Sequence, residues 1–238
     1  MLSPKPWRVE AVIQLIAGVL VCLCLGAATI GILRQAGVAA FQSPDSFACV
    51  LLATLSFQGL AWILIFIFLK FHRVDWRDAL GLRNPHLIRS LLLAAGVLVV
   101  MLPVVLALQQ ASVVVLEKIG WAPEDQRAVN LLVNAGSFWM RGYLALFAVV
   151  LAPVAEEFIF RGVLFPFVKQ LGRPKLAWIG VSLLFAAIHV NAPTFVPLFV
   201  LALALTWIYE KTGCLLASIM AHSLFNGVNL LVLFLQNR

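Results

Sequence analysis

Two adjacent glutamates and an arginine lie within an apolar stretch of the chain that is long enough to cross a lipid bilayer. They are Glu156, Glu157 and Arg161, in the segment AEEFIFRGVLF. An ionised side chain at the centre of a bilayer costs roughly 3 kcal/mol on insertion scales, so such residues usually face a water-filled or protein-lined site. The pattern therefore predicts chemistry, or ion movement, within a membrane.

The spacing of these residues gives the two carboxylates different surroundings. On a helix, Glu157 and Arg161 are four residues apart and can form an ion pair, whereas Glu156 is turned about 100° away around the helix axis. Pro153 cannot donate a hydrogen bond to the carbonyl of Val149, which favours a bend and the entry of water or a polar partner. An ion pair that only fixes helix packing would leave Glu156 without a counter-charge.

Two further apolar segments carry polar side chains at helical spacing. Phe185 and His189 share one helix face in FAAIHV. His222 and Asn226 do the same in AHSLFNG. Taken alone, the first pair also suits a histidine that caps a helix or lies at the membrane interface, and the second suits interhelical hydrogen bonds that hold helices together.

The depth of these residues in the membrane favours a single site. At about 1.5 Å per residue, Glu156, His189 and Asn226 each lie roughly 20 to 23 Å from the nearest basic loop along the chain. His222 lies one turn nearer to that side. We therefore expect these side chains to converge on one hydrated pocket.

The composition is that of an integral membrane protein. Of the 238 residues, 63% are hydrophobic and 11% are charged, whereas soluble domains average about 25% charged residues. A spanning helix needs about 20 mostly apolar residues, and the chain lacks the alternation of a membrane barrel. The sequence predicts an all-α polytopic transmembrane helical bundle of about seven spans, within a range of six to eight. The spans are expected at residues 11–33, 48–69, 90–116, 142–168, 176–190, 194–209 and 213–235.

The net charge of +7 indicates topology. Basic residues gather before the first span, at residues 70–89 and at residues 169–175, so the positive-inside rule places these loops and the N-terminus in the cytoplasm. They do not form one face interleaved with aromatic residues, so we expect no nucleic-acid partner. The short loops favour a bacterial inner membrane. The cysteines lie in or beside spans without disulfide or metal spacing, and we expect them to be packing residues: they are Cys22, Cys24, Cys49 and Cys214.

Polar residues divide this membrane domain into two parts. Residues 1–141 carry almost no ionisable group inside their spans and are interpreted as a transmembrane scaffold, with a short amphipathic piece at residues 75–82. Residues 142–238 carry the motifs described above and are interpreted as a catalytic helical core.

Together the three motifs resemble those of the CPBP family, which is named for CAAX proteases and bacteriocin-processing enzymes and is also called the Abi family. They are EExxxR, FxxxH and HxxxN, in this order on successive apolar segments, and the resemblance covers about residues 142–230. It implies a glutamic-type intramembrane endopeptidase without a cofactor. Its substrate would be a membrane-associated protein or peptide, either lipidated or carrying a C-terminal transmembrane sorting signal.

The resemblance also implies a role for each motif residue. Glu156 and His189 would activate a water molecule, while His222 and Asn226 would stabilise the tetrahedral oxyanion. Elementary chemistry agrees, because a poorly solvated carboxylate is a stronger base than one in water and amide or imidazole donors stabilise developing negative charge. The remaining motif residues would hold the site in position: they are Glu157, Arg161 and Phe185.

Three other functions fit the same residues. Two histidines and Glu156 could ligate zinc while Glu157 served as the base, although the chain has no HExxH motif. Intramembrane ionisable residues also mark proton and ion transporters, although no inverted repeat is evident. The third is a binding protein that confers immunity to a bacteriocin.

Overall fold

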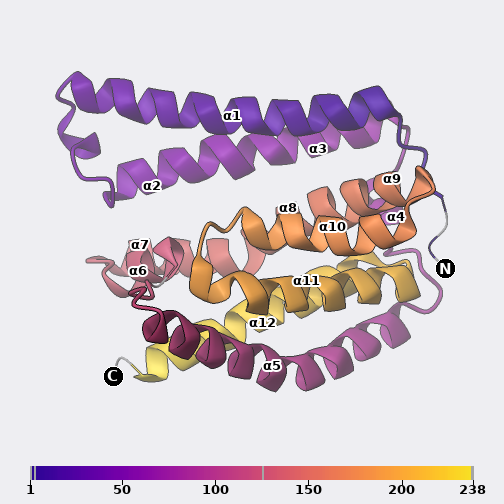
Figure 1. Ribbon diagram of the computed structural model, residues 1–238. Helices are drawn as coiled ribbons and strands as arrows, with labels where there is room; N and C mark the ends of the chain where they lie inside the picture. Colours follow the sequence, from indigo (N-terminus) through magenta and orange to yellow (C-terminus); the bar gives the residue numbers. More distant parts are fainter. Residues whose placement is uncertain (1, 3, 125, 237–238) are drawn as a thin grey trace. The chain divides into compact units, whose positions relative to one another are not determined.

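The computed structural model describes residues 2, 4–124 and 126–236, and in this part of the chain every regular element is a helix (Figure 1). This confirms the predicted all-α class. The described chain divides into two compact units, residues 6–76 and a larger unit of the residues before Pro6 with those after Trp76. The predicted division into a scaffold and a core at residue 141 stays a prediction.

The smaller unit is a hairpin of two long helices. Helix α1 spans Val9–Gln35, and the second helix runs through α2 (Phe47–Thr54), the π-helical turn η2 (Leu55–Gly59) and α3 (Leu60–Phe71). The short 3₁₀ turn η1 (Ala39–Phe41) lies between them. Gly26 of α1 allows the two long helices to lie close together, because a Cβ at this position would overlap the hydroxyl of Ser56.

The larger unit begins with the short helix α4 (Trp76–Leu80), within the predicted amphipathic piece, and continues into α5 (Leu87–Lys118) and α6 (Arg127–Val133). A long continuous helix follows, built from α7 (Phe138–Leu146), η3 (Phe147–Leu151), α8 (Ala152–Glu157), η4 (Phe158–Leu164) and α9 (Phe165–Gln170). The last three helices are α10 (Pro174–Ala187), α11 (Ala192–Thr212) and α12 (Leu215–Gln236). Both η3 and η4 are π-helical, a form that is rare and frequently found at functional sites.

Six helices are long and apolar enough to cross a membrane, by length and composition. They are Val9–Gln35, Phe47–Phe71, Leu87–Lys118, Phe138–Gln170, Ala192–Thr212 and Leu215–Leu235. The expected span at residues 176–190 corresponds to α10, which has 14 residues. At 1.5 Å per residue this is about 21 Å, shorter than the roughly 30 Å hydrocarbon layer.

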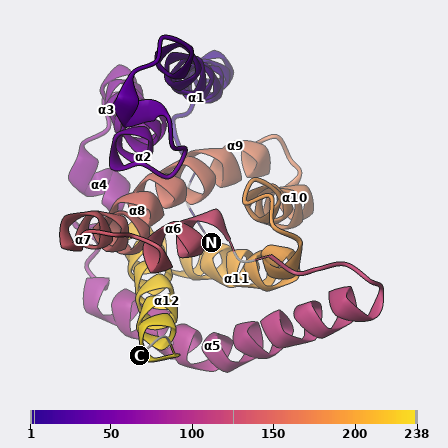
Figure 2. The ribbon, with the colours of Figure 1, turned by 90° about the vertical axis from the view of Figure 1, so that its left-hand side faces the viewer.

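The core of the larger unit lies where α5, α11 and α12 pack together, and both views show α5 alongside the other two helices (Figures 1 and 2). Small residues such as Ala94, Ala217 and Ala221 allow these helices to approach closely. The buried residues of this cluster come from all three helices and the turn between α11 and α12: Ala94, Leu98, Val105, Leu201, Leu205, Ile208, Cys214, Ala217, Ala221 and Phe225.

Several basic loops of the larger unit meet at one end of its helices. Asn84 donates a hydrogen bond to the carbonyl of Thr212 over 2.9 Å. Lys169 of α9 pairs with Glu210 of α11. The helices therefore alternate in direction between two ends, with α10 as a shorter pass (Figure 1).

We expect Gly81→Ala to destabilise the larger unit more than Gly120→Ala does. Both glycines lie in the left-handed region, with φ of +79° and +78°, where a Cβ costs about 1–2 kcal/mol. A Cβ on Gly81 would also lie 2.8 Å from the Cα of Cys214, whereas nothing lies within 4 Å of that position at Gly120. Thermal unfolding in detergent measures both losses, and equal decreases in Tm would show that the contact with Cys214 adds nothing.

Candidate active site

Glu157 and Arg161 form the ion pair that their spacing predicts, and both side chains are fully buried. The Nη1 of Arg161 donates to the Oε1 of Glu157 over 2.8 Å. Its other nitrogens donate to α11, with Nη2 bonded to the carbonyl of Ala202 over 3.1 Å and Nε to the hydroxyl of Thr206 over 3.4 Å. Arg161 therefore joins the long helix of residues 138–170, called the motif helix below, to α11 while keeping its charge neutralised.

His222 of α12 lies between the two glutamates. Its Nδ1 is 2.9 Å from the Oε1 of Glu157, and its Nε2 is 3.9 Å from the Oε2 of Glu156. The side chain of Glu156 is 20% exposed, whereas that of Glu157 is 0% exposed. The accessible carboxylate is therefore Glu156, as its position on the helix predicts. The link from His222 to Glu157 was not predicted, because no spacing within one helix signals a contact between helices.

Phe185 of α10 is the aromatic residue around which the charged groups are arranged. It is 0% exposed, and its ring centroid lies 4.9 Å from that of His189 and 5.6 Å from that of His222. The guanidinium carbon of Arg161 lies 4.5 Å from the same centroid, a favourable cation–π distance. Both imidazole rings and the guanidinium group therefore pack against the Phe185 ring.

His189 lies just beyond the C-terminus of α10. Its Nδ1 is 2.7 Å from the carbonyl oxygen of Phe185. The other ring nitrogen, Nε2, takes no part in this contact. The next residue, Val190, has a φ of +46°, a left-handed conformation that is strained for a β-branched side chain. In the described part of the chain no hydrogen bond joins His189 to Glu156, so their joint action on a water molecule stays a prediction.

Asn226 donates a hydrogen bond to a backbone carbonyl that a proline leaves without its helical donor. In the π-helical turn η3, each carbonyl bonds to the N–H five residues later, so the carbonyl of Ala148 would pair with Pro153, which has no N–H. The Nδ2 of Asn226 donates to that carbonyl over 2.8 Å instead. The sequence predicted that the carbonyl of Val149 would lack a donor, which would be correct in an α-helix. In a π-helical turn the carbonyl without a donor is one residue earlier, at Ala148.

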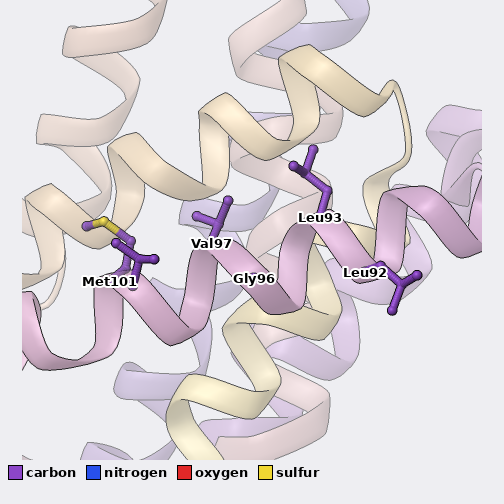
Figure 3. Close-up of a pocket in the computed structure, with 6 residues that line it drawn as sticks. Leu92, Leu93, Gly96, Val97 and Met101 are labelled. Atoms are coloured by element: carbon purple, nitrogen blue, oxygen red, sulfur yellow. The ribbon is translucent and has the colours of Figure 1, made fainter.

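A recess on α5 is lined only by apolar residues and offers no group for chemistry (Figure 3). Its lining residues are Leu92, Leu93, Gly96, Val97, Val100 and Met101. Among the described residues, no three His, Cys, Asp or Glu side chains form a group that could hold a metal ion.

The fold and this cluster define a polytopic helical membrane protein with a buried carboxylate, histidine and arginine site. Residues 138–228, which contain all three motifs, match the model of the family described as "Type II CAAX prenyl endopeptidase Rce1-like". This match falls on the segment that carries the three motifs and confirms the resemblance drawn from them.

One relative is similar to part of the chain. The UPF0177 protein YxdF of Lactococcus lactis subsp. lactis (strain IL1403) is 30% identical over 78 residues. This alignment covers 32% of the present chain and 42% of the relative, so the chain spans less than half of that protein. No solved structure matches the chain.

We expect Arg161→Ala to destabilise the protein by about 3–5 kcal/mol, because it leaves Glu157 buried without a counter-charge. Lys169→Ala is a matched control, since the side chains of Lys169 and its partner Glu210 are 24% and 25% exposed. For such a partly solvated pair we expect a cost of at most about 1 kcal/mol. Denaturant unfolding in detergent measures both, and equal costs would contradict the buried pair's importance.

Proposed function

We propose that this protein is an intramembrane endopeptidase of the glutamic type. The observation that supports this most is the contrast between the two glutamates, because Glu157 is neutralised by Arg161 whereas Glu156 is accessible beside an imidazole. A free carboxylate beside His222 can take a proton from a water molecule. The description of the matching family, which names a prenyl endopeptidase, supports the same reaction.

In the proposed reaction, Glu156 and His189 activate a water molecule. One water O–H bond breaks as its proton passes to Glu156, while the water oxygen forms a bond to the peptide carbonyl carbon. The π electrons of the carbonyl move to its oxygen, which becomes the oxyanion. The intermediate then collapses, the C–N bond breaks, and the proton is delivered to the leaving nitrogen.

His222 and Asn226 are the proposed donors to the oxyanion. A carboxamide nitrogen carries two N–H groups, and the carbonyl of Ala148 takes only one of those on Asn226. The hydrogen bond to Ala148 also holds the amide in place, so the second N–H has a fixed direction. Glu157, Arg161 and Phe185 are proposed to position these groups.

The proposed substrate is a membrane-associated protein or peptide, either lipidated or carrying a C-terminal transmembrane sorting signal. The bilayer itself is the second partner, because long apolar helices make up most of the chain. We place the protein in a bacterial inner membrane with its N-terminus in the cytoplasm. The meeting of basic loops at one end of the larger unit supports that orientation.

We expect Glu156→Gln to lower the cleavage rate by about 10² to 10⁴, the usual effect of losing a proton-transfer group, without a change in Tm. The assay uses the full chain in nanodiscs with a prenylated CAAX peptide and, separately, a peptide with a C-terminal transmembrane segment. Glu210→Gln, outside the site, is the control and should cleave at the wild-type rate. Wild-type turnover by Glu156→Gln would refute the assignment, and ion flux abolished by Glu156→Gln without any cleavage would indicate a transporter.

A second experiment separates the glutamic from the zinc mechanism. We expect the wild-type protein to keep its cleavage rate after dialysis against a strong chelator and to hold less than one zinc per chain by elemental analysis. A rate that falls on chelation and recovers with added zinc would instead support the two histidines and Glu156 as metal ligands.

A further inference from the structure

We propose that Glu157 is a positioning residue that acts through His222 and determines the order of its proton transfers. It holds the imidazole with its proton on Nδ1, so that Nε2 faces Glu156 as a proton acceptor. His222 must therefore gain a proton before it can donate a hydrogen bond to an oxyanion. The role of this pair in catalysis rests on the proposed function, whereas the position of the proton does not.

The hydrogen-bond partners of Glu157 determine which nitrogen of His222 carries the proton. Arg161 is always charged and can only donate, and its burial requires an ionised partner, which Glu157 supplies through Oε1 over 2.8 Å. An ionised carboxylate only accepts hydrogen bonds. The 2.9 Å contact between the same Oε1 and the Nδ1 of His222 is therefore a hydrogen bond donated by the imidazole.

The second oxygen of Glu157 strengthens this assignment. Its Oε2 is buried and has no hydrogen-bond partner among the described residues. Both donors thus converge on Oε1, and a proton arriving at Glu157 would attach to Oε2, where no N–H competes for the lone pairs. Even then Oε1 would still accept from His222. The direction of the hydrogen bond does not depend on the charge of Glu157.

A neutral imidazole has only one N–H, so a proton on Nδ1 leaves a lone pair on Nε2. That Nε2 lies 3.9 Å from the Oε2 of Glu156, and two acceptors at this distance do not bond to each other. A water molecule that donates one O–H to each would satisfy both. His189 has the same arrangement, because the backbone carbonyl of Phe185 can only accept from its Nδ1.

The resulting sequence of proton transfers is balanced. The attacking water breaks one O–H bond while its oxygen bonds to the carbonyl carbon, and the proton reaches the Nε2 of His222 either directly or by transfer from Glu156, which then returns to its ionised form. Once Nε2 is protonated, His222 is an imidazolium that donates to the new oxyanion. When the C–N bond breaks, this proton passes to the leaving nitrogen and His222 returns to its neutral form.

Among the described residues, the charged and titratable groups near His222 come from three parts of the chain. Glu156 and Glu157 approach from α8, and Arg161 of η4 reaches it through Glu157. His189, just beyond the end of α10, contacts the same Phe185 ring as His222 does. Glu157 is the group in contact with Nδ1, so the proposal can be tested by changing that residue.

The first test reads the proton directly and needs no substrate. The full chain, labelled with ¹⁵N-histidine, is placed in nanodiscs above neutral pH, and solid-state NMR separates protonated from unprotonated ring nitrogens. The His222 signals are assigned by their loss in His222→Gln. We expect Nδ1 to carry the proton and Nε2 to be bare. A proton on Nε2 of neutral His222 would overturn the proposal.

The second test separates positioning from packing. Glu157→Leu with Arg161→Met replaces the buried ion pair with apolar side chains of similar size, an exchange that is often neutral or stabilising. If Glu157 served only to neutralise Arg161, this double variant would cleave as wild type does. We expect instead a loss of about 10² or more in kcat with little change in KM, as when the residue that orients a catalytic histidine is removed, and a shift of the His222 proton to Nε2.

A conservative variant completes the design. Glu157→Gln combined with Arg161→Met removes the buried cation and keeps an oxygen that accepts from Nδ1, so we expect this pair to retain the Nδ1 proton and most of the activity lost in Glu157→Leu with Arg161→Met. If it were as inactive as that first double variant, with the proton still on Nδ1, the proposal would be overturned. A wild-type protein that cleaves nothing would count against the proposed endopeptidase function, whereas the NMR result would still decide where the proton lies.

Discussion

The arrangement of the larger unit depends on the burial of one guanidinium group. Arg161 is 0% exposed, and a buried charge is tolerated only when it is paired and fully hydrogen-bonded. Its acceptors come from the same helix through Glu157 and from α11 through Ala202 and Thr206. Because these acceptors must all be in reach at once, the motif helix and α11 have little freedom to slide past each other.

The irregular geometry of the motif helix follows from a second constraint, the need to satisfy every backbone group inside a membrane. Pro153 removes an N–H from the helix, and the adjacent π turn leaves the carbonyl of Ala148 without an intrahelical donor. Asn226 supplies that donor from α12. The same side chain therefore satisfies the long helix of residues 138–170 and joins α12 to it, one turn after His222.

The sequence predicted those features that depend on spacing within one helix. The Glu157–Arg161 pair, the accessibility of Glu156 and the family resemblance followed from i,i+4 patterns and their order in the chain. Features that depend on how helices pack against each other could not be predicted. The hydrogen bond from His222 to Glu157 crosses between α12 and α8, and no periodicity in either segment encodes it.

Other differences arise from local hydrogen-bond choices that composition does not reveal. The carbonyl that Asn226 satisfies belongs to Ala148 and not Val149, because a π turn and an α turn have the same apolar pattern. Likewise, the apolar run of residues 176–190 predicted a span, but α10 ends at Ala187. Val190 then takes a left-handed conformation and the chain reverses toward α11. Hydropathy reports the environment of that segment, not where its helix stops.

The adjacency of the two glutamates explains why their roles cannot be exchanged. Successive residues on a helix point about 100° apart, so only one of them can face Arg161 and α11 while the other is directed toward the accessible side. Glu157 lies on the buried side, where two donors share its Oε1, and Glu156 keeps a 20% exposed carboxylate. A single acid could not both neutralise the buried cation and remain available to a water molecule. The pair therefore allows an apolar bundle to contain a permanent positive charge and an accessible carboxylate within about one helical turn.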